Sequence, residues 1–348
     1  MVDVGEALVK RYDESWDRPH RPGPQDLWQE SDWLTFYDPI SRVGGIYRIG
    51  QEPNRRKGQP NLFVFALGGQ RYLMRDLGGR GADCDLTDED RWQTGYRAAG
   101  NRVDALGSGR VRFRWDYPET EADLEFGDSH YEPRDWSMTN KGDEIIATLN
   151  ADGHLECAGR LRGRVRIGQS DYTVDCFAHR DRSWGYREHY MVKMKRAFGA
   201  WGTTGPDFSF AMMRLELKSG EILTTGFVNR NGRGDDIANA RLITTLDADF
   251  LSPIAGAVLL TLENGEAIRI ECDIAQAHGG FAPGTSFNSV GTFSHGGKVG
   301  FCDYSATANP GGGDQIASQT DATLVALEAG LSRSAEPSWT LAKGNATG

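Results

Sequence analysis

The densest group of side chains that could carry out chemistry lies in the segment CFAHRDRSWGYREHY, residues 176–190. It combines imidazole, guanidinium, carboxyl, phenol and indole groups in a short stretch. In an extended strand, residues two apart share a face, so His179 and Asp181 point one way while Arg180 and Arg182 point the other way. A carboxyl group among arginines can be tuned as an acid or as a base, depending on its burial. This segment is therefore the first candidate for a catalytic site.

Asp181 is the candidate general acid, and His179 and Arg182 could orient it. Tyr190 is a second-choice acid or base. Glu30 is a further candidate catalytic residue, because it is a lone carboxylate in an aromatic stretch. The alternative interpretation of the 176–190 block is structural, since buried charged groups at a domain junction often pair in a network that locks the domains together.

Side chains suited to an apolar ligand lie in this block and in the strands that follow it. Methionine fills irregular apolar cavities, and aromatic rings stabilise a developing cation through their faces. The predicted substrate-binding residues are Trp184, Tyr186, Met194, Trp201, Phe208, Phe210 and Met212. The alternative is that these side chains are ordinary core. Asp303 and His295, in a later hairpin, could reach the mouth of the same cavity.

Motifs for metals and nucleotides are absent from the sequence. The seven histidines form no HExxH or HxH pattern, and the five cysteines form no CxxC pair. There is no P-loop, no GxSxG elbow, and no GxGxxG between a strand and a helix. We therefore predict no metal site and no cofactor, and we expect activity to survive chelation.

Short alternating runs at a spacing of about ten residues must position these groups. The run RVRFRWDY (110–117) places apolar side chains on one face and arginines on the other. Asn264-Gly265, between two such runs, is a strong hairpin signal. Glycine makes up 44 of the 348 residues, which favours many tight turns. The sequence predicts an all-β protein of two units.

Net charge and hydropathy argue against a nucleic-acid-binding protein and against a membrane-spanning protein. With 39 Lys+Arg and 49 Asp+Glu the net charge is −10, which argues against nucleic acid as a partner. The arginine ladders at 110–114 and 160–166 are interpreted as solvated faces that pair with neighbouring acids. The sequence contains no run of 18 apolar residues, so we expect no membrane span. The N-terminus has no signal-peptide pattern, so we expect a cytoplasmic protein.

Four segments together resemble the carotenoid hydratase (hydroxyneurosporene synthase)-like superfamily: WQESDWLTFYDP, VGGIYRIGQEPN, HRDRSWGYRE and GTFSHGGKVGFCDYS. The resemblance covers roughly residues 25–305, and its most specific part is Asp181–Gly185. It implies two tandem lipocalin-like antiparallel β-barrel domains with few short helices. It also implies an apolar cavity in or between the domains, and neither a nucleotide nor an obligatory metal.

The expected organisation has four parts. An aromatic arm (1–40) packs on the barrels, a first β domain spans 41–178 and a second spans 179–331, and a loose tail covers 332–348. The chain departs from the His-Asp-His-Asn-Trp-Gly block of the hydratase branch. It keeps Asp181 but has Arg180 and Arg182 in place of the histidines and Ser183 in place of the asparagine. The resemblance therefore implies the architecture more than the reaction.

The sequence thus predicts a cofactor-independent acid–base enzyme, a hydratase or dehydratase, an isomerase or a cyclase. Its substrate would be a hydrophobic terpenoid, steroid-like or aromatic small molecule. One alternative is a non-catalytic lipocalin-like carrier, although a carrier gains nothing from burying an acid with arginines. A structural or interaction protein is the third possibility, and a homodimer is a further expectation.

Overall fold

Strands make up most of the described part of the chain. The computed structural model describes residues 12–75, 95–139, 142, 144, 152–186, 194–246, 253–273 and 286–308. Short 3₁₀ turns among them are η1 (Glu14–Asp17), η2 (Pro53–Arg55) and η4 (Trp136–Met138), and the separate described residues Gly142 and Glu144 are α-helical. The predicted all-β class is confirmed. Tyr190 and the predicted C-terminal tail lie outside the described residues.

The first unit is an antiparallel sheet of 11 strands in the order β4-β3-β2-β1-β11-β10-β8-β7-β6-β5, with β9 paired to β10. The strands are β1 (Trp28–Asp38), β2 (Val43–Glu52), β3 (Lys57–Ala66), β4 (Arg71–Arg75), β5 (Gly95–Ala98), β6 (Asn101–Gly107), β7 (Arg110–Tyr117), β8 (Thr120–Gly127), β9 (Arg134–Asp135), β10 (Gly153–Ile167) and β11 (Ser170–Tyr186). Strands β1 and β11, from the two ends of this part of the sequence, pair directly.

The second unit is a closed barrel whose strands follow one another in sequence order. They are β12 (Met194–Gly205), β13 (Phe208–Leu217), β14 (Ile222–Arg230), β15 (Arg233–Leu246), β16 (Pro253–Leu262), β17 (Ala267–Asp273), β18 (Ser286–His295) and β19 (Lys298–Ala308). Pairing of β12 with β19 closes the barrel. This unit is an antiparallel barrel of the kind that the resemblance implied.

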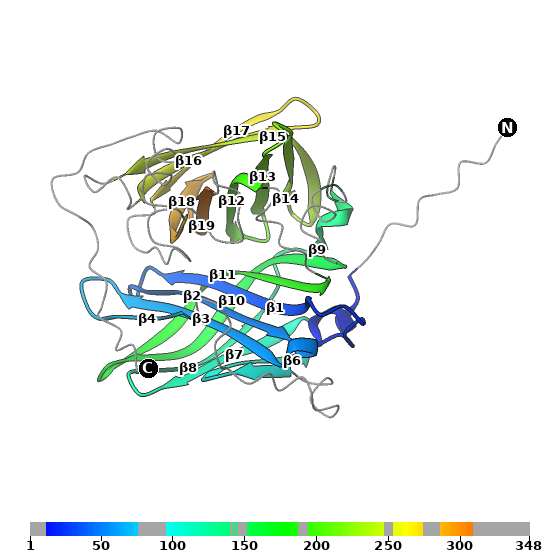
Figure 1. Cartoon of the computed structure of the whole chain (residues 1–348). Coiled ribbons are helices and arrows are strands. Elements are labelled where there is room, and N and C mark those ends of the chain that lie inside the picture. The colour runs from blue at the N-terminus through cyan, green and yellow to red at the C-terminus, as the bar shows by residue number, and fades with distance from the viewer. Residues whose placement is uncertain are drawn as a thin grey trace.

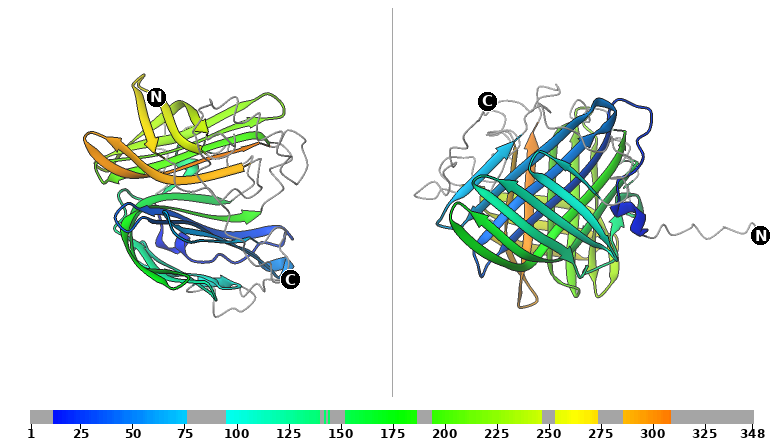
Figure 2. Two further views of the ribbon diagram at one scale, coloured as in Figure 1. Left: turned by 90° about the vertical axis from the view of Figure 1, so that its left-hand side faces the viewer. Right: turned by 90° about the horizontal axis from the view of Figure 1, so that it is seen from below.

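The barrel lies against one face of the large sheet (Figure 1). Strands β1 and β11 of the sheet contact β18 and β19 of the barrel, and β10 contacts β12. The sheet curls, so β6, β7 and β8 form a layer on the side away from the barrel (Figure 2). The interface between the two units therefore runs along β1, β10 and β11 of the sheet.

The boundary between the units lies later in the sequence than the predicted position at residue 178. β11 is a single strand of 17 residues, and its pairing with β10 continues without a break from Ser170 to Trp184. Because this pairing holds residues 179–186 in the first sheet, the second unit begins at β12. The predicted arm is likewise divided, since residues 28–38 form β1, whereas the described residues 12–27 precede the sheet.

Alternation places each core as the sequence predicts. In β7, Val111, Phe113 and Trp115 are buried in the first unit's core, and the arginines between them face outward. These outer arginines pair with acids on neighbouring strands, for example Arg112 with Asp123. The interpretation of the arginine ladders as solvated, acid-paired faces is confirmed.

Candidate active site between the two units

The polar block of β11 presents different chemistry on its two faces. Ala178 belongs to the core inside the curled sheet, and Arg180 and Arg182 follow it on the same inward face. Phe177 packs in an apolar cluster that contains residues of both units, and His179 and Asp181 follow it on the face toward the barrel. The predicted separation of the two sets by strand alternation is therefore found in the structure.

The inward face carries fully buried ion pairs. Arg182 contacts the Glu30 carboxylate closely, and its Nε lies 3.6 Å from Asp32 Oδ2. Arg180 contacts Asp17 of η1 in the same way. Nearby carboxylates raise the pKa of both guanidinium groups despite the cost of burial, whereas burial raises the pKa of Asp32. We call Asp17, Glu30, Asp32, Arg180 and Arg182 the arm lock.

The chain before β1 covers this lock. Arg182 donates a hydrogen bond of 3.0 Å to the backbone oxygen of Arg18, and the backbone N–H of His20 donates to Glu30. The His20 ring stacks on Trp184 with 4.1 Å between ring centroids. Tyr186 lies opposite Trp28 in the β1–β11 pairing. The predicted candidates Glu30, Arg182, Trp184 and Tyr186 thus lie around the site where the arm meets the sheet.

The outward face places an imidazole between carboxylates from both units. His179 Nε2 contacts Glu156 of β10 closely, and its Nδ1 lies 3.6 Å from Asp303 Oδ2 of β19. The imidazole stacks on Trp201 of β12 with a centroid distance of 4.9 Å. Thr35 of β1 donates a 2.8 Å hydrogen bond to the same Asp303 oxygen. We call Thr35, Glu156, His179, Trp201 and Asp303 the interface cluster.

Each member of the interface cluster is held by its strand. Thr35 lies directly opposite His179 in the β1–β11 pairing, and Trp201 lies opposite Asp303 in the β12–β19 pairing. A Cβ on Gly199 would come within 2.4 Å of the Trp201 indole, so the glycine makes room for that ring. Trp136 of η4 donates a 2.9 Å hydrogen bond to Glu156 Oε1. The cluster is therefore positioned by regular structure.

Electrostatics and hydrogen bonding distinguish the interface cluster from ordinary core. Burial opposes the charged imidazolium, but Glu156 and Asp303 outweigh it and raise the pKa of His179 to about 9. Burial raises the pKa of Glu156 despite the neighbouring histidines. His179 Nδ1, Asp303 Oδ1 and Trp201 Nε1 are buried and find no hydrogen-bond partner among the described residues. Such orphaned atoms are uncommon in native proteins and call for an explanation.

Asp181 lies beside this cluster rather than in it. Its Oδ2 is 3.2 Å from His154 Nε2, and its side chain is 23% exposed. His154 Nε2 is also 3.6 Å from Glu156 Oε1. One ligand atom from each of His154, Glu156 and Asp181 lies within 4.8 Å of the others, so this group could hold a metal ion. The spacing in the sequence does not show this set, because strand pairing brings it together.

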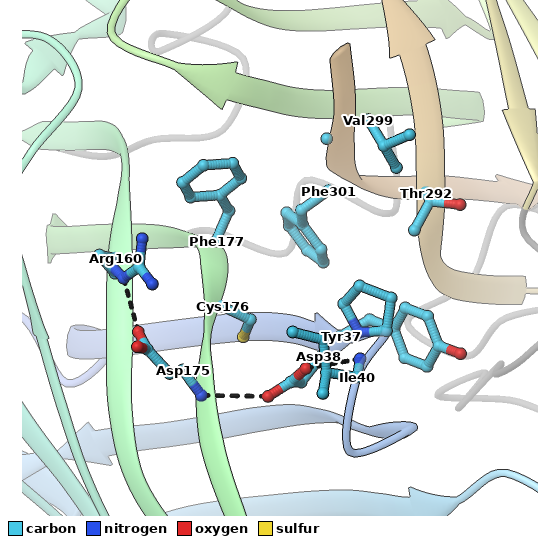
Figure 3. A pocket seen from close by; sticks show the side chains of 12 residues that line it. Tyr37, Asp38, Ile40, Arg160, Asp175, Cys176, Phe177, Thr292, Val299 and Phe301 are labelled. Atoms are coloured by element: carbon cyan, nitrogen blue, oxygen red, sulfur yellow. Dashed lines mark hydrogen bonds and ion pairs between the residues drawn. The ribbon is translucent and has the colours of Figure 1, made fainter.

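An apolar pocket of about 200 Å³ opens between the units next to the interface cluster (Figure 3). Tyr37, Phe177 and Phe301 line it, and each lies two residues from a cluster member on β1, β11 or β19. Two residues of strand span about 7 Å, so the pocket and the cluster are immediate neighbours. An Arg160–Asp175 ion pair lies on the β10–β11 side of the pocket.

The other predicted ligand-binding residues lie elsewhere. Phe208, Phe210 and Met212 point into the second unit's core, and His295 stacks on Phe208 at 3.7 Å. Met194 packs in a separate small cluster with residues of β13 and β14. Among the predicted binding residues, Trp201 is the one that the structure brings to His179.

Sequence reasoning missed Glu156, His154 and Thr35. A two-residue turn joins β10 and β11, with Ile167 opposite Ser170. A hairpin of that length fixes the register, which places Glu156 opposite Asp181 and His154 opposite Ser183. The length of this turn could therefore have indicated from the sequence that Glu156 and His154 lie beside Asp181 and Ser183. Nothing comparable in the sequence indicates that Thr35 reaches Asp303.

The family of this chain follows from its sequence. The family described as "domain of unknown function (DUF7064)" matches residues 13–310, which include both units and the interface cluster. The chain belongs to the DUF7064 family. No curated protein matches its sequence.

Solved structures with the same fold span nearly the whole described chain. CghA with Sch210972 has a TM-score of 0.54 at 12% identity, covering 81% of this chain and 88% of CghA. An AttH-type protein from Nitrosomonas europaea has a TM-score of 0.57 at 13% identity, with 83% and 98% covered. Kievitone hydratase from Nectria haematococca has a TM-score of 0.52 at 9% identity, with 86% and 94% covered. The predicted resemblance to carotenoid hydratase-like, lipocalin-fold proteins is confirmed for this DUF7064 fold.

Within the described residues, no helix is long and apolar enough to cross a membrane. The expected cytoplasmic location and homodimer stay predictions.

Proposed function

We propose that this DUF7064 protein is an acid–base enzyme of the hydratase or isomerase type, with a hydrophobic small molecule as its substrate. Its reaction takes place at the interface cluster, and the apolar part of the substrate occupies the adjoining pocket. The observation that carries this proposal is the placement of His179, between carboxylates from two units, next to an apolar pocket.

The orphaned atoms indicate where the reacting group sits. His179 Nδ1, Asp303 Oδ1 and Trp201 Nε1 come from both units and need hydrogen-bond partners. A hydroxyl or carbonyl group of a substrate supplies a donor or acceptor for such atoms. The Trp201 ring, stacked on His179, also offers a π face near a developing positive charge. This arrangement favours a substrate with one oxygen function at the end of an apolar group.

Pocket size limits the apolar group. An engineered cavity of about 150 Å³ accommodates a benzene ring. The pocket of about 200 Å³ therefore suits one ring or a short branched chain. A larger substrate would extend from the pocket toward solvent.

In the dehydration direction, His179 passes a proton to the leaving hydroxyl, which departs as water. The now neutral His179 imidazole then takes a proton from a neighbouring C–H bond, and the electron pair of that bond forms the double bond. Hydration is the reverse. Positioned proton transfer of this kind contributes about 10²–10⁴-fold to a rate. Two structures with the same fold support this proposal by their names. One is called a hydratase, and the other, CghA, was solved with the compound Sch210972.

The test uses oxygen exchange, because the substrate itself is unidentified. Purified full-length protein is incubated in H₂¹⁸O with a panel of tertiary terpenoid alcohols and phenolic alkenes, and ¹⁸O incorporation is followed by mass spectrometry. We expect exchange with at least one compound class, reduced about 10²–10⁴-fold in His179→Gln. His295→Gln is the matched control and retains the wild-type rate, since His295 stacks on Phe208 away from the cluster.

Exchange that is equal in His179→Gln and wild type would remove the catalytic role of the cluster. Binding of the same compounds in native mass spectrometry, without exchange in any class, would instead identify a carrier.

A further inference from the structure

His154, Glu156 and Asp181 form a set of imidazole and carboxylate groups on one face of two paired strands. His154 and Glu156 are two residues apart on β10, so they share a face. Asp181 lies directly opposite Glu156 on β11. Neighbouring strands fix all three positions, which is the kind of rigid support that a metal site requires.

The ligand atoms already converge. His154 Nε2 lies 3.2 Å from Asp181 Oδ2 and 3.6 Å from Glu156 Oε1. One ligand atom from each of the three residues lies within 4.8 Å of the others. Ligands about 2.0–2.2 Å from one ion are separated by roughly 3–4 Å. The set therefore needs only small adjustments to bind a single ion.

Partners outside the set hold the ligands in place. The backbone N–H of His154 donates a 3.0 Å hydrogen bond to Asp135, and Trp136 donates to Glu156 Oε1. The other Glu156 oxygen contacts His179. Hydrogen-bonded support of this kind is characteristic of ligating carboxylates.

The charge of the site favours a cation. Glu156 is fully buried, and among the residues that the structure describes its ion-pair partners are two histidines, His154 and His179, rather than an arginine or lysine. Arg180 and Arg182 point to the opposite side of the sheet, where they pair with Asp17 and Glu30. Partial exposure of Asp181 gives an ion a path from solvent.

We propose that His154, Glu156 and Asp181 bind one divalent transition-metal ion. One imidazole and two carboxylates suit Zn²⁺, Mn²⁺ or Fe²⁺ better than Ca²⁺, which takes six to eight oxygen ligands. Three protein ligands leave at least one coordination position open to water. This binding does not depend on the proposed function, since it concerns the side of Glu156 away from His179.

The test measures metal binding directly. Full-length protein is stripped with a chelator and titrated with Zn²⁺, Mn²⁺ and Ca²⁺ by calorimetry, and with Co²⁺ while its visible absorption is recorded. We expect one equivalent of Zn²⁺ to bind more tightly than Ca²⁺, and Co²⁺ to give d–d bands of a protein-bound ion.

Asp181→Asn and His154→Gln each remove a ligand. They should weaken Zn²⁺ binding by more than the roughly 10–100-fold that loss of an outer-shell partner costs. Asp181→Asn is the main variant because its side chain is partly exposed, and thermal unfolding checks that each variant folds. Asp128→Asn, at an exposed carboxylate paired with Arg162, is the control and binds Zn²⁺ as the wild type does.

Absence of a one-equivalent Zn²⁺ event, or equal affinity in wild type and Asp181→Asn, would overturn the metal site. Because the readouts are heat and absorption rather than turnover, neither result depends on the oxygen-exchange experiment.

Discussion

The two faces of β11 use polar groups in opposite ways. On the inward face, Arg180 and Arg182 are permanently charged and contact the carboxylates of Asp17 and Glu30. On the outward face, His179 and Asp181 lie among histidines and carboxylates, whose protonation can change. The inward groups join the arm to the sheet, whereas the outward groups lie at the seam between two units.

This difference separates the two interpretations of the 176–190 block. A network of fully buried ion pairs with arginine fixes structure, because the guanidinium keeps its charge at any pH the protein meets and leaving it without its carboxylate is costly. Imidazole between carboxylates can accept and release a proton, which is what acid–base chemistry needs. We therefore propose a structural role for the inward face, which joins the arm to the sheet rather than one unit to the other, and the chemical role for the outward face.

The largest effect on stability is expected from the arm lock. Glu30→Gln leaves the buried Arg182 guanidinium without its closest carboxylate. We expect the free energy of unfolding to fall by about 3–5 kcal/mol. In a protein of this size the thermal midpoint should then fall by about 4–7 °C, measured by calorimetry.

The double variant Glu30→Leu/Arg182→Met replaces the closest pair with apolar groups and should recover part of this loss, because both charges of that pair are removed together. Asp32 would lose Arg182 but keep its hydrogen bond from Tyr96, so the recovery should be incomplete. A midpoint for Glu30→Gln within about 1 °C of wild type, a change of less than about 1 kcal/mol, would contradict the assignment of the lock.

An intermediate effect is expected from pH at the seam. His130 Nδ1 lies 2.6 Å from Thr203 Oγ1 of the barrel, and its ring contacts Phe177. Burial, with a contribution from Arg160, lowers the pKa of His130 to about 4. Below pH 6.5 the unfolded chain takes up a proton that the folded protein does not, so stability is lost as the pH falls from 6.5 toward 4.

At pH 5 this single group should cost about 2 kcal/mol relative to pH 7.5. Urea unfolding of wild type and of His130→Asn at both pH values measures it. Asparagine offers its amide to Thr203 but does not titrate, so the variant should lose less stability on acidification. Equal losses in the two proteins would show that His130 does not carry the effect.

The smallest effect is expected from the exposed arginine ladder. Arg112 pairs with Asp123, but the two side chains are 42% and 50% exposed. Solvated pairs of this kind contribute about 0–1 kcal/mol. Arg112→Gln should therefore change the unfolding free energy by less than about 1 kcal/mol, against several for the lock. A loss in urea unfolding as large as that of Glu30→Gln would show that burial does not distinguish these arginines.

Local pattern predicted the fold and part of the site. Period-two alternation indicated β7 and divided His179 from Arg180 because strand geometry is local. The length of the short β10–β11 turn also fixes the strand pairing, which sets Glu156 opposite Asp181. Asp303 could be singled out by its type, but its distance to His179 depends on how the barrel packs on the sheet. That packing involves side chains spread over both units, which no single segment encodes.

The hydrogen bond from Thr35 to Asp303 joins residues 268 positions apart. At a synthesis rate of about 5–20 residues per second, Asp303 leaves the ribosome roughly 15–50 s after Thr35. Over that interval the sheet face that will meet the barrel, which includes Tyr37, Phe63 and Phe65, has no cover from β18 and β19. During synthesis, this apolar sheet face therefore has to be kept from associating with other nascent chains until the last strand is translated.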